Sequence, residues 1–256
     1  MKNKFTILGC GSSLGSPWIN NYWGKLKKNN PKNIRSRCCA HIQYNGISIL
    51  IDTSPDIKSQ MQFNKIKQVD AIVYTHEHAD QTVGIFEMRP FFWINKKKIP
   101  VYGNSRTIKA LKQKYTFCFM ARHGYQPIMH ASVVKNSFKI KKKNKSIKLN
   151  CFDVQHGLIK AYGYEFNKIA YISDCNKIFN KSKKYLKNLN YLIIDCLRKN
   201  KHPSHFNYDD AMNFIKLVKP KKAILTNLHI DLDYFKLKKK LPKNIIPAYD
   251  GLSFNF

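Results

Sequence analysis

Hydrophobic residues along the chain gather in short runs separated by polar turns, a pattern more typical of strands than of long helices. Two of these runs, 41–45 and 47–52, meet at Asn45-Gly46, a dipeptide that favours a two-residue turn between antiparallel strands. The pattern therefore predicts a hairpin there and a chain rich in sheet. Further strands are expected at 4–10, 70–75, 99–104, 146–154, 161–166, 168–174, 191–197, 221–228 and 244–254.

Helical segments are expected between several of these strands. Residues 208–219 follow Asn207, which is suited to cap a helix, and Asp210 stands three residues later as a capping-box partner. A helix over 83–95 is predicted to end or to be interrupted at Arg89-Pro90, because proline removes a backbone N–H. Segments 54–65, 105–115 and 232–241 are predicted as further helices, and 116–138 shows no clear pattern.

This order of elements predicts an α/β fold. Two sheets packed face to face, with helices on their outer sides, would bury the apolar strands. The chain has 256 residues and contains no linker long enough to divide it. Residues 1–256 are therefore predicted to form one domain, at the upper end of the size range of single domains.

The composition is that of a globular protein, with 43% hydrophobic residues. No run approaches the roughly 18 consecutive apolar residues that a membrane span needs, and the N-terminal segment lacks the apolar region of a signal peptide. We therefore expect a cytoplasmic protein with no membrane partner. The seven cysteines show no paired spacing, which predicts reduced, mostly buried thiols.

The charge of the chain is strongly positive, with a formal net charge of +31. Only six of the 46 basic residues are arginine, the residue best suited to bidentate phosphate recognition. Lysine, asparagine and isoleucine are abundant and share A/T-rich codons, so codon bias accounts for much of the charge. Nucleic acid is therefore a possible partner but not the favoured one. The field would still steer a small anionic substrate toward the protein.

Acidic residues are scarce, with 15 in the whole chain, so their positions are informative. Asp52, Asp80 and Asp174 lie at the ends of predicted strands or beside histidines. Site chemistry explains this placement better than solubility does.

The sequence T-H-E-H-A-D-Q at 75–81 follows a predicted buried strand and presents His76, His78 and Asp80 at alternate positions. Alternate residues of an extended backbone face the same side, so both imidazoles and the carboxylate can converge. This donor set suits Zn²⁺, Mn²⁺ or Fe²⁺. A surface loop with two histidines is the alternative, and the preceding strand together with Asp80 favours the metal site.

One such motif cannot complete a coordination sphere, so distant segments must supply further ligands. His156, Asp174 and His229 each lie at or just beyond the end of a predicted strand. Taken singly, each residue of this kind is more often an ordinary core or loop residue than a ligand. Their shared strand-end position is what marks them as candidates.

T-H-E-H-A-D, with I-D-T-S-P-D upstream and Q-H-G, S-D and L-H downstream, resembles the metallo-β-lactamase superfamily. The closer resemblance is to the branch that contains the phosphoribosyl 1,2-cyclic phosphodiesterase of phosphonate breakdown. Segments such as TILGCGSSLGSP, ILIDTSPD and PAYDGL carry this likeness over nearly the whole chain. The resemblance implies a four-layer αββα sandwich with two divalent metal ions at one edge.

The resemblance also implies roles for individual residues. The first metal would be held by His76, His78 and His156, and the second by Asp80 and His229, with Asp174 bridging both. Asp52 would orient a ligand imidazole, and His205 matches a histidine of the family that faces the substrate.

Gln81 departs from the family pattern, which usually has a histidine ligand of the second metal at this position. A glutamine carbonyl is a weaker, neutral donor, so we expect a second site of lower zinc affinity or greater tolerance of Mn²⁺ or Fe²⁺. Two ions, Zn²⁺ or Mn²⁺, remain the prediction, and loss of the second ion is the alternative. The zinc-binding cysteines of the phosphonate-pathway enzyme are also not evident.

These residues predict a phosphodiesterase that attacks a small or cyclic phosphate ester with a metal-bridging hydroxide. Asp80 and His205 are the candidate catalytic residues, with His205 as the proton donor to the leaving group. His205 also lies just before the Asn207 cap, so a role at the helix N-terminus is the alternative. A ribonuclease Z-like nuclease and a non-catalytic metal- or metabolite-binding member are the competing functions.

Aromatic residues at 91–93 also lead us to expect a homodimer.

Overall fold

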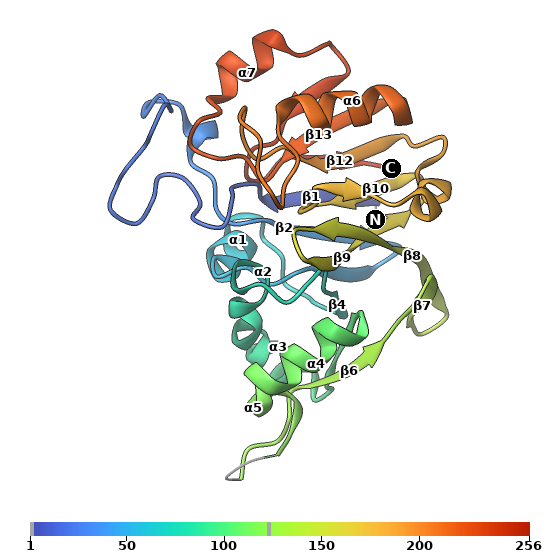
Figure 1. Ribbon diagram of the computed structural model, residues 1–256. Helices are drawn as coiled ribbons and strands as arrows, with labels where there is room; N and C mark the ends of the chain where they lie inside the picture. Colours follow the sequence, from blue (N-terminus) through green and yellow to red (C-terminus); the bar gives the residue numbers. More distant parts are fainter. Residues whose placement is uncertain (1–2, 122–123) are drawn as a thin grey trace.

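Two β-sheets stacked face to face form the centre of the protein in a computed structural model that describes residues 3–121 and 124–256 (Figure 1). The first sheet has seven strands in the order β15-β1-β2-β3-β4-β5-β6. They are β1 (Lys4–Gly9), β2 (Cys39–Tyr44), β3 (Ile47–Ile51), β4 (Ala71–Val73), β5 (Ile99–Gly103), β6 (Met129–Val133) and β15 (Ser253–Asn255).

The second sheet has eight strands in the order β11-β8-β9-β10-β12-β13-β14, with β7 also paired to β8. The strands are β7 (Ser137–Lys142), β8 (Lys145–His156), β9 (Ile159–Phe166), β10 (Ile169–Ile172), β11 (Lys177–Ile178), β12 (Tyr191–Asp195), β13 (Lys222–Thr226) and β14 (Ile245–Pro247). Strands β10, β12, β13 and β14 run parallel, so their carboxyl ends meet at one edge. Residues that follow these strands therefore lie near one another.

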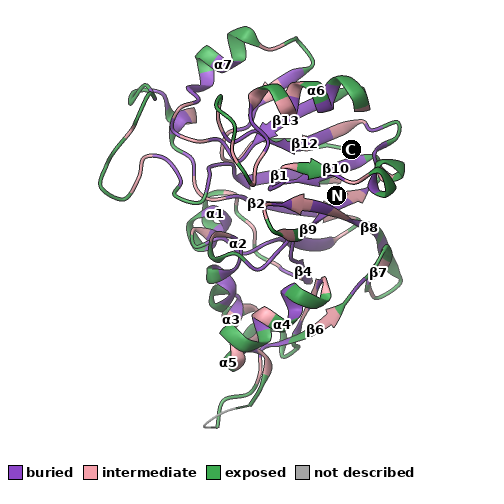
Figure 2. Cartoon of the chain, in the orientation of Figure 1, coloured by how far each residue is buried: buried purple, intermediate pink, exposed green. Residues whose placement is uncertain are grey.

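The main hydrophobic core lies between the two sheets. Ile7 and Ile49 of the first sheet belong to the same buried cluster as Tyr164 and Ile193 of the second. Figure 2 accordingly shows the central strands buried along most of their length, whereas β6 and β7 are more exposed. Burial of this apolar surface stabilises the sandwich by about 25 cal/mol per Å² removed from water.

Helices cover the outer face of each sheet and complete four layers. Leu50 on the outer side of β3 shares a buried cluster with Leu111 of α4, and Leu192 of β12 shares another with Phe214 of α6. The predicted αββα sandwich is confirmed. The helices are α1 (Ile57–Phe63), α2 (Ala79–Thr82), α3 (Arg89–Asn95), α4 (Ser105–Lys114), α5 (Thr116–Phe119), α6 (Tyr208–Val218) and α7 (Tyr234–Lys240), with 3₁₀ turns η1 (Pro31–Asn33), η2 (Val83–Met88) and η3 (Asn180–Leu186).

Two local predictions are confirmed. Strands β2 and β3 form a hairpin in which Asn45 and Gly46 have φ values of 47° and 80°, the left-handed conformation that this turn requires at both positions. Helix α6 begins after Asn207, whose side chain and that of Asp210 form a complete capping box. Both features depend only on neighbouring residues, which is why the sequence predicts them.

The predicted interruption of the helical segment at Arg89-Pro90 is confirmed, but the proline begins a helix there and does not end one. Helix α3 begins at Arg89, with Pro90 in its first turn, and the preceding residues form η2. A proline in the first helical turn loses no hydrogen bond, because that N–H has no partner within the helix. The same chemistry that ends a helix therefore starts this one.

All seven cysteines are buried and free, as predicted. Among the described residues, no helix has the length and apolar character to cross a membrane. In the aromatic segment 91–93, Trp93 is 52% exposed while Phe91 and Phe92 pack partly against the core. Association of two copies through this segment stays a prediction.

Arg35 ties the long segment after β1 to the C-terminal part of the chain. Its side chain is 1% exposed, and its Nη2 donates to the carbonyl of Leu232 at 2.7 Å and to Asn33 Oδ1 at 3.2 Å. A further bond runs from Nη1 to the carbonyl of His229 at 3.3 Å. The guanidinium therefore satisfies two carbonyl groups of the distant segment 229–232 and the side-chain oxygen of the nearby Asn33.

Replacing Arg35 with alanine is expected to lower the free energy of unfolding by about 3 kcal/mol, because buried carbonyls lose their donors. Urea unfolding measures this as a lower midpoint at an unchanged slope. Arg106→Ala is the control, since the Arg106 side chain is 63% exposed and a surface ion pair contributes about 1 kcal/mol or less. Equal losses in the two variants would contradict the anchoring role of Arg35.

Candidate metal centre

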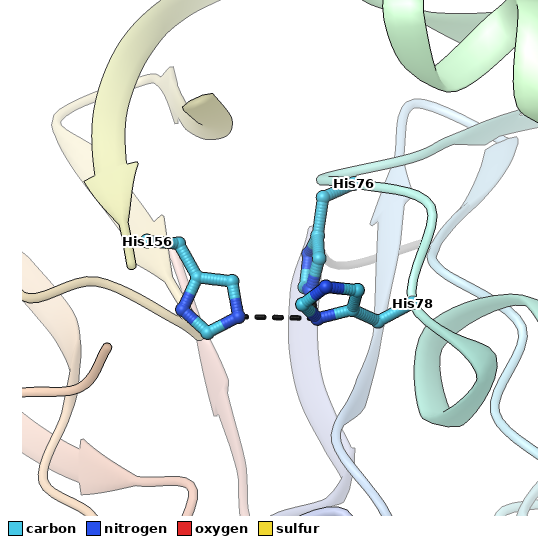
Figure 3. Close-up of side chains that lie close together, drawn as sticks. All are labelled: His76, His78 and His156. Carbon is cyan, nitrogen blue, oxygen red and sulfur yellow. Dashed lines mark hydrogen bonds between the residues drawn. The ribbon is translucent and has the colours of Figure 1, made fainter. Parts of the chain in front are cut away.

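Three histidines converge at the edge of the sandwich (Figure 3). His76 follows β4, His78 directly precedes α2, and His156 is the last residue of β8. His78 Nδ1 lies 3.0 Å from His76 Nε2 and 3.1 Å from His156 Nε2. A tetrahedral zinc with bonds of about 2.0–2.1 Å separates its ligand atoms by about 3.3 Å. The three nitrogens are thus close to the spacing that one ion requires.

Hydrogen bonds fix which nitrogen of two of these imidazoles carries the proton. His156 Nδ1 lies 2.7 Å from the carbonyl oxygen of Ser204, which can only accept, so Nδ1 donates and Nε2 keeps its lone pair. The Thr75 hydroxyl donates to Asp52 at 2.9 Å and lies 3.0 Å from His76 Nδ1. Because its proton goes to Asp52, Thr75 accepts from His76 Nδ1, and His76 Nε2 is likewise left free.

Asp52 therefore acts on the imidazole through Thr75. Its carboxylate accepts both the backbone N–H of Thr75 at 2.8 Å and the hydroxyl of the same residue. The resemblance implies that Asp52 orients a ligand imidazole. In the structure Asp52 does so indirectly, because the Thr75 hydroxyl lies between its carboxylate and His76 Nδ1. The sequence contained the signal for Thr75, which lies between the strand and His76, but hydroxyl groups at such positions are too common to be singled out.

Burial keeps the histidines in the form that binds metal. It lowers the pKa of His76 to about 3 and also lowers the pKa of His78. Both side chains are therefore neutral near pH 7 and offer a lone pair. Neutral imidazole is the form that ligates divalent metals.

Asp80 reaches the site from a helical turn and not from extended backbone. It lies in the first turn of α2, because the chain turns into a helix after His78. Burial, together with the neighbouring Asp174 carboxylate, raises the pKa of Asp80 to about 6. The alternation predicted for His76, His78 and Asp80 thus holds for the histidines alone.

Asp174 lies just beyond β10, and its carboxylate forms a second group with His156 and His205, whose ligand atoms lie within 4.8 Å of one another. Asp174 is 4% exposed. The sequence expected Asp174 and His156 to converge from strand ends, and the structure brings them together. His205 joins them from the segment that leads into α6.

His205 is paired with a carboxylate that the sequence analysis missed. Its Nδ1 lies 2.8 Å from Asp195 Oδ2, and Asp195 is fully buried at the end of β12. Burial alone lowers the pKa of His205, but the Asp195 carboxylate outweighs it and raises this pKa to about 9. His205 is therefore protonated near pH 7. The strand-end rule that marked Asp174 applies equally to Asp195.

Gln81 and His229 differ from their expected arrangement. Gln81 is fully buried, and its Nε2 donates to Asp80 Oδ2 at 3.1 Å. His229 Nδ1 lies 3.1 Å from Asp231 Oδ2, and its ring packs 6.0 Å from that of Trp18. Among the described residues, His229 belongs to neither group of convergent ligand atoms.

Asn227, two residues earlier, reaches the site where His229 was expected. Its Nδ2 lies 3.3 Å from Asp174 Oδ1, and the side chain is 2% exposed. The sequence places Asn227 just beyond β13, so its position offered a signal. His229 was predicted instead, because histidine is a more common metal ligand than asparagine.

The two donor sets fit a metal unequally. His76, His78 and His156 present three unprotonated nitrogens at metal-binding spacing, and they fit one divalent ion. Around Asp80 and Asp174, two carboxamides face the carboxylates with N–H groups, and the histidines beside Asp174 are His156, which belongs to the first set, and the protonated His205. This arrangement does not fit a second ion, which needs lone pairs directed toward it.

Fold and site together define a metallo-β-lactamase-type protein, and comparison with known proteins agrees. The model of the beta-lactamase superfamily domain matches residues 48–230, so the chain belongs to this superfamily. Within it, the chain resembles the PhnP branch. A crystal structure described as a new diphosphatase from the PhnP family is 32% identical, with a TM-score of 0.91 over 100% of this chain and 98% of its own.

Two further relatives extend the comparison. Human tRNase Z, short form, is 17% identical and covers 98% of both chains with a TM-score of 0.69, a likeness of fold alone. A protein of Porphyromonas gingivalis (strain ATCC BAA-308 / W83) named octanoyltransferase is 27% identical over 251 residues. The match covers 96% of this chain and 50% of that relative, so the chain spans about half the length of the curated relative it matches.

Proposed function

We propose that the protein is a metal-dependent phosphodiesterase that hydrolyses a small or cyclic phosphate ester. The observation that carries the proposal is the convergence of three imidazole nitrogens, two with fixed tautomers, beside a protonated histidine. Similarity to a diphosphatase of the PhnP family supports phosphate esters as the substrate class. The positive net charge of the chain favours the approach of such an anion.

The ion, Zn²⁺ or Mn²⁺, would be held by His76 Nε2, His78 Nδ1 and His156 Nε2, with Asp174 offsetting its charge. When bound, such an ion supplies Lewis acidity toward a phosphoryl oxygen and lowers the pKa of water. The protein contributes the rigid placement of the imidazoles, which Thr75 and Ser204 hold by their hydrogen bonds. A second ion, as the sequence predicted, would depend on Asp80, Gln81 and His229.

His205 and Asp80 are the residues we assign to proton transfer. Hydrolysis forms one P–O bond to water and breaks one P–O bond to the alcohol. The leaving oxygen needs a proton, which His205 holds because Asp195 raises its pKa to about 9. The proton released by water passes to Asp80, whose pKa of about 6 leaves it mostly ionised at neutral pH.

An RNA substrate is the second candidate. It is favoured by the similarity of fold to human tRNase Z and by the net charge of +31. The few arginines of the chain argue against it, since phosphate contacts in nucleic-acid complexes draw heavily on arginine. A member that binds metal or metabolite without turnover is the remaining alternative.

Purified protein supplied with Mn²⁺ or Zn²⁺ is expected to hydrolyse bis-p-nitrophenyl phosphate and to leave precursor tRNA intact. Release of p-nitrophenol is followed by absorbance, and RNA cleavage by gel electrophoresis. Specific cleavage of precursor tRNA would favour the nuclease instead. Failure to turn over the phosphodiester with either metal would contradict the enzyme and support the non-catalytic alternative.

A further inference from the structure

Two buried carboxamides stand among the carboxylates of the site. Gln81 Nε2 lies 3.1 Å from Asp80 Oδ2 and 3.4 Å from Asp174 Oδ2. Asn227 Nδ2 lies 3.3 Å from Asp174 Oδ1 and 3.1 Å from Asp195 Oδ1. Each amide nitrogen carries two hydrogens, and each amide meets two carboxylates. Both oxygens of Asp174 therefore receive an amide N–H.

The orientation of these amides follows from the charges around them. If the Gln81 side chain were turned over, its carbonyl oxygen would face two carboxylate oxygens, and two charge-assisted hydrogen bonds would be replaced by repulsion between acceptors. Asn227 Nδ2 also lies 3.0 Å from His205 Nδ1, and its contacts with two carboxylates outnumber this one. Gln81 Oε1 is buried with no hydrogen-bond partner. Turning the amide would merely exchange this unpaired oxygen for an unpaired nitrogen. The carboxylates therefore favour the orientation in which the amide N–H groups of Gln81 and Asn227 are directed toward them.

We propose that this protein builds a single-ion centre, in which the amides of Gln81 and Asn227 take the place of a second ion. The inference rests on the metal centre of the proposed function. Three carboxylates packed this closely require compensating positive charge or hydrogen-bond donors. His205 pairs with Asp195. The amides supply donors to Asp80 and Asp174, and their N–H dipoles present partial positive charge where a cation would need lone pairs.

The surroundings of His229 point the same way. Its Nδ1 lies 3.1 Å from Asp231 Oδ2 but makes no hydrogen bond with the described residues, and its ring packs against Trp18. The expected imidazole ligand of a second ion therefore lies against Trp18 and Asp231, and Asn227 occupies the position beside Asp174. One ion on His76, His78 and His156 remains.

Metal content tests the inference directly. The full chain is incubated with excess Zn²⁺ or Mn²⁺, desalted and analysed for metal against protein concentration. We expect about one ion per chain, the number that one three-histidine site holds. In the Mn²⁺ form, electron paramagnetic resonance should show the hyperfine pattern of an isolated ion. Two ions per chain, or the signal of an exchange-coupled pair, would overturn the proposal.

Restoring imidazoles at both amides tests the cause. The double variant Gln81→His/Asn227→His is expected to bind a second ion, because two lone pairs replace two N–H groups beside Asp80 and Asp174. Gln62→His/Asn144→His adds the same two histidines at exposed positions and should keep one ion. If Gln81→His/Asn227→His folds and still binds only one ion, the role given to the amides is contradicted. If that variant does not fold, the metal content of the unaltered chain decides.

The ion count and the reaction can fail separately. One bound ion without phosphodiester turnover would reject the proposed function and uphold the single-ion centre. Turnover with two bound ions would uphold the proposed function and reject the single-ion centre.

Discussion

Replacing His78 with alanine is expected to abolish metal binding and to reduce phosphodiester turnover by more than about 100-fold, the upper range for residues that only support a ligand. His78 Nδ1 is the atom that approaches both other imidazoles, at 3.0 and 3.1 Å. Without it, two nitrogens remain, too few to hold an ion against solvent. Elemental analysis and the initial rate with bis-p-nitrophenyl phosphate measure the two effects.

His130→Ala is the matched control for this variant, because His130 is exposed on β6, outside the site. It should retain the metal and the rate of the unaltered chain. Full metal content in His78→Ala would show that the ion binds elsewhere. Full turnover without bound metal would reject the metal-dependent mechanism.

Replacing His205 with alanine is expected to affect substrates according to their leaving groups. An alkoxide leaving group needs a proton, so kcat for an alkyl phosphodiester should fall by about 10²–10⁴-fold, the usual contribution of a general acid. p-Nitrophenolate departs without a proton, so the rate with bis-p-nitrophenyl phosphate should fall by less than about 10-fold. Steady-state rates with both substrates supply the comparison.

His202→Ala serves as the control for His205, since the two rings lie 5.0 Å apart and His202 carries no paired carboxylate in its described contacts. It should change both rates little. Equal losses on the two substrates in His205→Ala would indicate that His205 holds the structure or the metal and does not donate the proton. The metal content of the variant separates these two explanations.

The sequence predicted the architecture well because the architecture depends on local patterns. Apolar strands, the Asn45-Gly46 turn and the Asn207 cap each act through a few neighbouring residues. The sequence predicted the interruption at Arg89-Pro90 but not that a helix begins there, because proline both ends and begins helices.

The candidate site was predicted less completely. Strand ends correctly marked His156 and Asp174 as neighbours, because parallel and adjacent strands bring their ends together. Which of Asn227 and His229 enters the cluster depends on how the chain leaves β13, a turn geometry that composition does not reveal. The direction of the Gln81 amide depends on the adjacent Asp80 and on Asp174 from a distant segment, so a local pattern does not settle it.

Strand β1 has a consequence for how the protein is made. It pairs with β2 on one side and with β15 on the other, and Phe5 packs in the core between the sheets. During synthesis, residues 253–255 emerge from the ribosome only after all of the strands that lie between β1 and β15 in the sequence. Until then one side of β1 exposes unpaired backbone groups, an edge that invites pairing with another chain. We therefore expect chains that stop before β15 to aggregate, and completion of the first sheet to be a late step of folding.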